Sequence, residues 1–178
     1  SFDWNHGIFM GLILGSEITA ATISDKIGQV RRDPFAMLPF IGYNICDYLQ
    51  HWIDIGQKAE KDLLPKIFYV NWFQKDEKGK FIWPGFGENS RVLKWIVGRV
   101  SGKGNAVETA IGYLPTPDDI DTEGLIIETG KMERLLEVNK DLWMREIALI
   151  KEYFQMFGDD LPQEMKDQLR ALENRFKD

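Results

Sequence analysis

The sequence predicts a mixed α/β or α+β domain, in which short strands and interspersed helices precede a C-terminal helical segment. Two observations predict this class. Before Lys131, β-branched and aromatic residues gather in short runs that end at glycine, proline or polar turns. From Lys131 onward, apolar residues recur every three to four positions, which is the spacing of one face of a helix.

The N-terminal part is expected to hold strands and a loop. Phe2 to Leu14 mixes aromatic and aliphatic residues with glycines, so we expect one or two strands there. The following stretch, GSEITAATISDKIG from Gly15 to Gly28, is small, polar and bounded by glycines. This composition predicts a mobile loop.

A helix is expected next, with Asn44 as its cap and Gly56 as its stop. Its apolar positions at helical spacing are Ile45, Leu49, Trp52 and Ile53. Lys66 to Phe73, KIFYVNWF, is continuously apolar, which predicts a strand buried on both faces. The polar run QKDEKGK would form a turn, and Lys80–Trp83 the return strand.

A second helix is predicted after Asn89 or Ser90, either of which could cap it, and it would end before Gly102. Its expected apolar face comprises Leu93, Ile96, Val97 and Val100. The stretch AVETAIGYL, residues 106–114, predicts a further short strand.

The helical tail spans residues 131–178, with Pro162 placed for a first helical turn. Two stripes at helical spacing are expected to be core: Trp143, Ile147, Ile150 and Phe154 form one, and Met165, Leu169, Leu172 and Phe176 the other. No chemistry is assigned to either stripe.

Composition narrows the class of protein. The 178 residues fit one compact domain or a large piece of one. The net charge of −6 disfavours a nucleic-acid partner, and no apolar run reaches the length of a membrane span. A single cysteine excludes an intrachain disulfide, so we expect a cytoplasmic protein. The chain begins on an apolar run without a polar leader, so we expect it to be part of a longer protein.

Several motifs fail as metal or phosphate sites. Asp119, Asp121 and Glu123 begin like a calcium loop, but Gly130 stands where a bidentate glutamate is required, so an acidic solvated loop is expected. His6 and His51 belong to no metal-binding pair, and each is expected to be structural.

Neither the single cysteine nor any phosphate-loop motif predicts a reactive site. Cys46 is expected to be a small buried residue and not a reactive thiol. No G-x-x-x-x-G-K-[ST] phosphate loop occurs in the sequence, and no metal ligands are predicted. A triphosphate is therefore not expected to be held by a phosphate loop of this segment.

An aromatic cluster is the candidate site. Its members are Trp72, Phe73, Phe81, Trp83 and Phe86, and Pro84, Gly85 and Gly87 keep the last of them out of regular structure. Core packing is one explanation. The other is a slot for a flat ring, in which phenyl faces stack on a purine.

A ring slot would still need hydrogen bonds to distinguish one base from another. The Asn89 amide, which both donates and accepts, and the backbone of Gly87 and Glu88 could supply them. The glycines beside Phe86 would let the backbone approach a base closely.

The stretch NWFQKDEKGKFIWPGFGENSRVLKWIV closely resembles the guanine-recognition segment of GTP-dependent phosphoenolpyruvate carboxykinase, and DPFAMLPFIGYN and ETAIGYLP also resemble that family. The resemblance runs in order across essentially all of residues 1–178. It implies that this is the C-terminal portion of the enzyme and shares part of its fold. It implies a guanine-recognition segment at 71–93, where Phe73, Phe81 and Phe86 wall the pocket and Asn89, with the Gly87 and Glu88 backbone, reads the base edge.

The resemblance also implies that Ser16 to about Gly28 is the mobile active-site lid. Its lid candidates are Ser16, Glu17, Ala20, Ala21 and Thr22. Animal members of the family carry arginine where this chain has Gly15 and Leu38, and a histidine near Ser24 and Asp25. These differences resemble a bacterial branch, and contacts that latch the lid are expected to differ.

The reaction implied by the resemblance converts oxaloacetate and GTP to phosphoenolpyruvate, carbon dioxide and GDP in gluconeogenesis, with Mn²⁺ and a nucleotide-bound Mg²⁺. The family's phosphate loop, metal ligands and substrate-binding arginines lie upstream of the matched segment, so no catalytic residue is assigned here. We expect the chain alone to be inactive and the full enzyme to be a monomer without membrane or nucleic-acid partners.

Two hypotheses of other classes stay open at this point. One is a non-catalytic guanine-nucleotide-binding or interaction module, which the missing phosphate loop suggests. The other is a single-stranded nucleic-acid binder that stacks bases on the exposed phenylalanines, against which the acidic balance argues.

Overall fold

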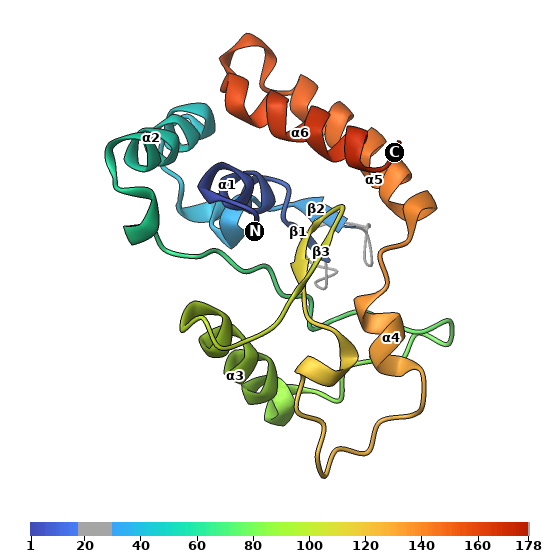
Figure 1. Cartoon of the computed structure of the whole chain (residues 1–178). Coiled ribbons are helices and arrows are strands. Elements are labelled where there is room, and N and C mark those ends of the chain that lie inside the picture. Colours follow the sequence, from blue (N-terminus) through green and yellow to red (C-terminus); the bar gives the residue numbers. More distant parts are fainter. Residues whose placement is uncertain (18–29, 178) are drawn as a thin grey trace. The chain divides into compact units, whose positions relative to one another are not determined.

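The protein consists of helices and two small antiparallel sheets, as the computed structural model shows (Figure 1). The structure describes residues 1–17 and 30–177. These form two compact units: Ser1–Ile67 with Lys140–Asp178, and Phe68–Asn139. The mixture of helices and strands expected from the sequence is therefore present.

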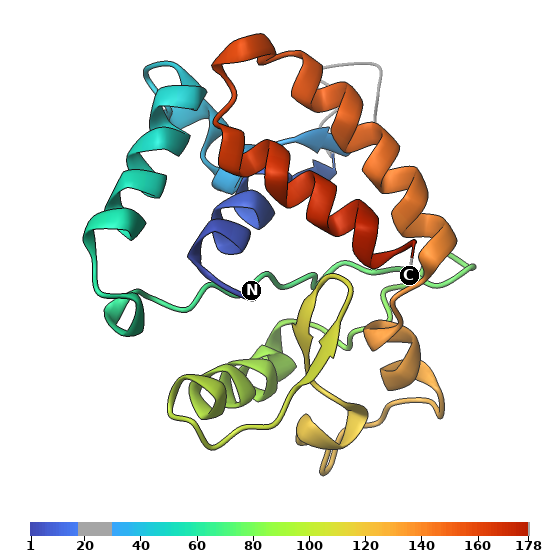
Figure 2. The same ribbon diagram turned by 45° about the horizontal axis from the view of Figure 1, so that its top comes forward.

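The first unit holds four α-helices and one two-stranded sheet among its described residues. They are α1 (Trp4–Leu12), β1 (Gly15–Glu17), β2 (Val30–Arg32), α2 (Ile45–Lys58), α5 (Lys140–Gln155) and α6 (Gln163–Arg175). Helix α1 packs against α2 and α6, and α5 lies beside α6 in both views (Figure 1 and Figure 2). The core of this unit includes Ile8, Phe9, Leu12, Leu49, Ile53, Ile147, Ile150, Met165 and Leu172.

The strands predicted between Phe2 and Leu14 are wrong, because this segment is helix α1. Asp3 caps it by accepting a hydrogen bond from the His6 N–H at 2.8 Å. The glycines of α1 allow close packing. A Cβ on Gly11 would lie 2.5 Å from the Phe35 ring, and one on Gly7 would lie 2.4 Å from Ile67.

The predicted loop at Gly15–Gly28 begins with a strand. Strand β1 pairs antiparallel with β2, and Ser16 stands opposite Arg31. The Ser16 hydroxyl donates to Asp33 Oδ2 at 3.2 Å. Residues 18–28 of the predicted loop lie outside the described part of the chain.

Helix α2 begins as predicted and ends later. The Asn44 side chain accepts from the Cys46 N–H at 2.8 Å, so the predicted cap is confirmed. Gly56 is not the stop, because the helix runs to Lys58. A Cβ on Gly56 would lie 2.2 Å from Trp4 Cδ1, so this glycine lets α1 approach α2.

Cys46 is buried, as expected, and burial raises the pKa of its thiol. His6 is also buried, and its Nδ1 accepts from the Phe2 N–H at 3.0 Å, so its structural role is confirmed. Burial, followed by the positive charge of the Ser1 amino terminus, lowers the pKa of His6 to about 4. His51, in contrast, is exposed.

The helical tail is confirmed, as α4 (Lys131–Leu136), α5 and α6. Both predicted stripes face cores: Ile147, Ile150, Met165 and Leu172 are each at most 2% exposed. Pro162 stands immediately before α6, where its missing N–H costs no helical hydrogen bond.

The second unit holds α3 (Asn89–Val100), β3 (Val107–Thr109), β4 (Gly112–Leu114) and α4. The single strand predicted at residues 106–114 is a hairpin of β3 and β4, which the Thr109 hydroxyl closes by donating to the Gly112 carbonyl at 2.7 Å. Shorter 3₁₀ turns in the two units are Pro34–Ala36, Leu38–Phe40, Lys61–Leu63, Phe86–Glu88, Pro117–Asp119 and Gly158–Asp160.

The strand predicted at Lys66–Phe73 is wrong, because these residues form no regular element. Tyr69 and Phe73 are exposed, whereas Phe68 and Trp72 pack against the core of the second unit. The return strand predicted at Lys80–Trp83 is reduced to one bridge between Lys75 and Phe81. An apolar run does not become a buried strand without ladder partners on both sides.

Helix α3 buries a different face from the one predicted. Trp95 is buried, and Val92 and Ile96 pack beside it. The predicted positions Leu93, Val97 and Val100 are 53%, 63% and 55% exposed, so of the predicted face only Ile96 packs against the core. Gly102 follows the helix with φ of +73°, which confirms the predicted end.

We expect Gly56→Ala to destabilise the first unit by about 1–3 kcal/mol, because the added methyl group would overlap the Trp4 ring. Gly42→Ala is the matched control, since nothing lies within 4 Å of a Cβ there. Urea denaturation measures both variants. An unchanged midpoint for Gly56→Ala would show that α1 and α2 are not packed this closely.

Stability of the first unit is expected to fall as the pH drops from about 6.5 to about 4. The folded state holds His6 neutral down to a pKa of about 4, while the unfolded chain takes up its proton near 6.5, so acid favours unfolding. The full loss is about 3 kcal/mol. Denaturation at several pH values measures the free energy of unfolding. The fall that His6 causes should disappear in His6→Gln and persist in His51→Gln.

Candidate functional site

The candidate site starts from a tight turn between Lys75 and Phe81. The Asp76 carboxylate accepts hydrogen bonds from the N–H groups of Lys78 and Lys80, both at 2.9 Å. These bonds, led by that from Lys80, lower the pKa of Asp76. The turn passes through Gly79, with φ of +75°, and brings the residues on either side of it together.

Phe73 and Phe81 meet across this turn. Their ring centroids are 6.0 Å apart and their planes lie at 64°, so the rings form a corner and not a parallel pair. Phe73 is 68% exposed and Phe81 54% exposed. The Lys75 ammonium lies 5.5 Å from the centre of the Phe81 ring.

The predicted aromatic cluster divides into buried and exposed members. Trp83 is 5% exposed and Trp72 packs tilted against it, with ring centroids 6.3 Å apart. Their hydrophobic cluster includes Trp95, Ile120 and Met132. Core packing therefore explains the two tryptophans and leaves the three phenylalanines exposed.

Phe86 lies on the loop that follows Trp83 and is 92% exposed. Among the described residues, its ring stacks on no other aromatic side chain. Gly85 has φ of +123° and ψ of −169°, a conformation that is essentially restricted to glycine. Gly87 has no positive φ, and nothing lies within 4 Å of a Cβ built on it. The backbone therefore requires Gly85, whereas neither backbone nor packing requires Gly87.

Asn89 is the first residue of α3, and its side chain turns toward the core. Its Oδ1 accepts from the indole Nε1 of Trp83 at 2.9 Å. The predicted capping role of Asn89 or Ser90 is wrong, because Glu88 holds the cap position and no side chain caps the helix. Sequence reasoning missed this bond, although a buried tryptophan N–H requires an acceptor.

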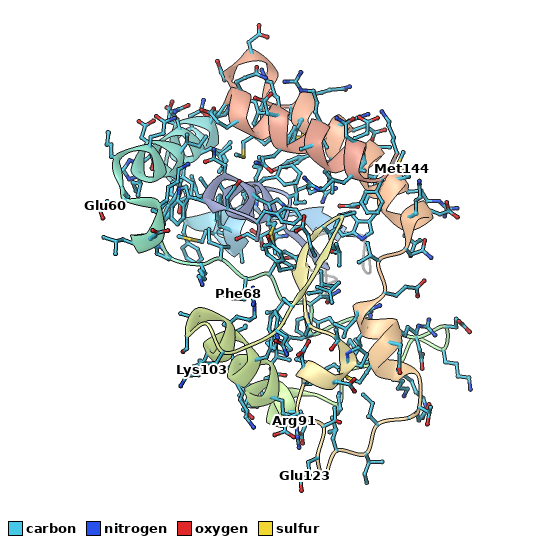
Figure 3. All side chains as sticks on the ribbon, in the orientation of Figure 1. Glu60, Phe68, Arg91, Lys103, Glu123 and Met144 are labelled. Atoms are coloured by element: carbon cyan, nitrogen blue, oxygen red, sulfur yellow. The ribbon has the colours of Figure 1, made fainter. Side chains whose placement is uncertain are left out.

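Glu88 is held by an ion pair. Its Oε2 accepts from Arg91 Nε at 2.5 Å, and Arg91 Nη1 donates to the Asp121 carbonyl at 2.8 Å. Figure 3 labels Arg91 near the loop that carries Glu123. These contacts join the beginning of α3 to the loop after Ile120 and set the backbone of residues 86–88.

The carboxylates of the acidic loop are held by hydrogen bonds and ion pairs. The Asp119 carboxylate accepts from the N–H and hydroxyl of Thr116, both at 2.8 Å, and these bonds lower its pKa. Asp121 pairs with Lys94 at 2.8 Å. In the part of the chain that the structure describes, no three His, Cys, Asp or Glu side chains are grouped to hold a metal ion.

Two of the predicted lid residues lie among the described residues of the first unit. Ser16 and Glu17 lie in β1, while Ala20, Ala21 and Thr22 lie outside the described residues. Leu38, in place of the arginine of animal enzymes, is 44% exposed. Within residues 1–17 and 30–177, no helix is long and apolar enough to cross a membrane.

Comparison with known families decides the relationship. The family described as "Phosphoenolpyruvate carboxykinase C-terminal P-loop domain" matches residues 1–175. The chain belongs to this family. Proteins named phosphoenolpyruvate carboxykinase (GTP) are similar to it: that of Treponema pallidum (strain Nichols) is 55% identical over 175 residues, and that of Paenarthrobacter aurescens (strain TC1) is 50% identical over 174.

Each of these matches covers 98% of the chain and 28% of the relative. The chain therefore spans little more than a quarter of the length of the carboxykinases that it matches. The family resemblance expected from the sequence is confirmed over residues 1–175.

Alanine substitutions at the two glycines beside Phe86 should affect stability differently. We expect Gly85→Ala to destabilise the second unit by about 1–3 kcal/mol, because alanine is strained at φ of +123°. Gly87→Ala should leave thermal stability within about 0.5 kcal/mol of the original, since its Cβ meets nothing. Equal effects of the two substitutions on the melting temperature would contradict this assignment.

Proposed function

We propose that residues 71–93 bind the guanine base of GTP or GDP in a carboxykinase. The observation that supports this most is that Phe73, Phe81 and Phe86 stay exposed while the neighbouring tryptophans pack into the core, in a chain of the carboxykinase family. Phe73, Phe81 and Phe86 supply ring faces. Apolar side chains that are exposed together can mark a ligand-binding surface.

Stacking on these rings would provide the nonselective part of the binding. Each base–aromatic contact contributes about 1–3 kcal/mol and scarcely distinguishes one base from another. Phe73 and Phe81 form a corner in which a base stacks on one ring and meets the edge of the other. Gly87 leaves open space beside Phe86, so a base can approach the backbone of Gly87 and Glu88 closely.

We infer that the whole protein converts oxaloacetate and GTP to phosphoenolpyruvate, carbon dioxide and GDP, as a cytoplasmic, monomeric enzyme with no nucleic-acid or membrane partner. Ser16 to about Gly28 would be its lid, and the two units part of its fold. Mn²⁺ and Mg²⁺ would assist phosphoryl transfer. We propose that this chain contributes base recognition to that enzyme.

The base site is tested by titrating the chain with GDP and ADP and following the indole N–H signals of its tryptophans by NMR. We expect saturable binding that favours GDP and shifts the Trp83 signal. Phe86→Ala should weaken GDP binding about 5- to 100-fold, which corresponds to the loss of one stacking contact.

Phe40→Ala is the matched control, because Phe40 is 79% exposed but lies in the first unit. It should bind GDP as the unchanged chain does. Equal responses to GDP and ADP, or full binding by Phe86→Ala, would reject the proposed site.

A further inference from the structure

The buried indole of Trp83 forms a hydrogen bond with the oxygen end of the Asn89 amide. Its Nε1 donates to Asn89 Oδ1 at 2.9 Å, and the Trp83 side chain is buried in the core of the second unit. An indole N–H is a donor only, so the atom facing it must be the amide oxygen. The orientation of the amide thus follows from the chemistry of its partner.

The remaining end of the amide is a donor. With Oδ1 bonded to the indole, the other polar atom of the amide is Nδ2, which carries two N–H donors and no acceptor. Rotating the amide would set two donors against each other and leave the buried indole N–H without an acceptor. Such an unmade bond is unfavourable because the N–H has already lost its water.

Guanine and adenine differ in what they present to a donor. Guanine carries the O6 carbonyl, an acceptor, where adenine carries the N6 amino group, a donor. An amide that presents only N–H donors forms a hydrogen bond with the guanine carbonyl and repels the adenine amino group. A freely rotating asparagine would not distinguish them, because it could turn its oxygen toward the adenine amino group.

We propose that Trp83 is a specificity-determining residue that acts through Asn89, by holding the amide in the orientation that selects a 6-oxopurine. Trp83 does not touch the base and is a positioning residue. Its ring is held by Trp72 and by the surrounding hydrophobic cluster, so it cannot turn to follow a rotated amide. This inference rests on the proposed guanine site.

The test is the ratio of the dissociation constants for ADP and GDP in Trp83→Phe, which keeps an aromatic side chain and removes the N–H. We expect the ratio to fall about tenfold, mainly through tighter ADP binding, because the freed amide can then accept from adenine. Inosine diphosphate, which keeps the O6 carbonyl, should follow GDP in the unchanged chain.

Trp95→Phe is the matched control. Trp95 lies in the same cluster, and its Nε1 donates to the Asn105 carbonyl at 2.9 Å, away from Asn89. It should keep the original ratio. An unchanged ratio in Trp83→Phe, or an equal fall in Trp95→Phe, would overturn the role of Trp83 while leaving guanine binding intact. A ratio near one in the unchanged chain would reject the proposed guanine site as well.

A second measurement needs neither a nucleotide nor a change at Trp83. In Asn89→Ala, hydrogen exchange of the Trp83 indole N–H should accelerate about tenfold, because its acceptor is gone. The indole N–H of Trp95 should exchange at its original rate and report that the fold is kept. Unaltered exchange at Trp83 would show that the bond does not hold the amide, and would overturn the inference.

Discussion

The hydrogen bond from Trp83 to Asn89 joins the hydrophobic core of the second unit to its exposed aromatic surface. A buried indole N–H needs an acceptor, and this requirement draws the first residue of α3 toward the core. The loop between them is therefore held at both ends, and Gly85 provides the backbone conformation that lets it turn. Phe86 lies on this loop and is 92% exposed.

The sequence predicted those helices that depend on interactions within their own segment. The Asn44 cap and the stripes of α5 and α6 follow from hydrogen bonds and periodicity within each segment. Helix α1 and the segment Lys66–Phe73 were predicted wrongly because their conformation depends on distant partners. The glycines of α1 make room for the side chains of Phe35 and Ile67, which lie far from them in the sequence.

The same distinction applies to the site. The identities of Phe73, Phe81, Phe86 and Asn89 could be picked out from the breakers, the aromatics and the family resemblance. Their exposure and orientation could not, since a run of aromatic residues is equally compatible with core packing. The contact between Asn89 and Trp83 could not be predicted from the sequence, because it depends on which face of α3 is buried with Trp95.

Burial separates the stability of the second unit from its proposed binding function at most positions. The three exposed phenylalanines and Gly87 add little to the core, so we expect substitutions there to alter ligand binding with little effect on stability. Trp83 is the exception, because its ring fills the core while its N–H orients Asn89. A substitution there alters stability and selectivity together, whereas one at Asn89 removes the acceptor and leaves the ring packed. Under this proposal, the selectivity of the site depends on a buried side chain, whereas its stacking surface consists of exposed side chains.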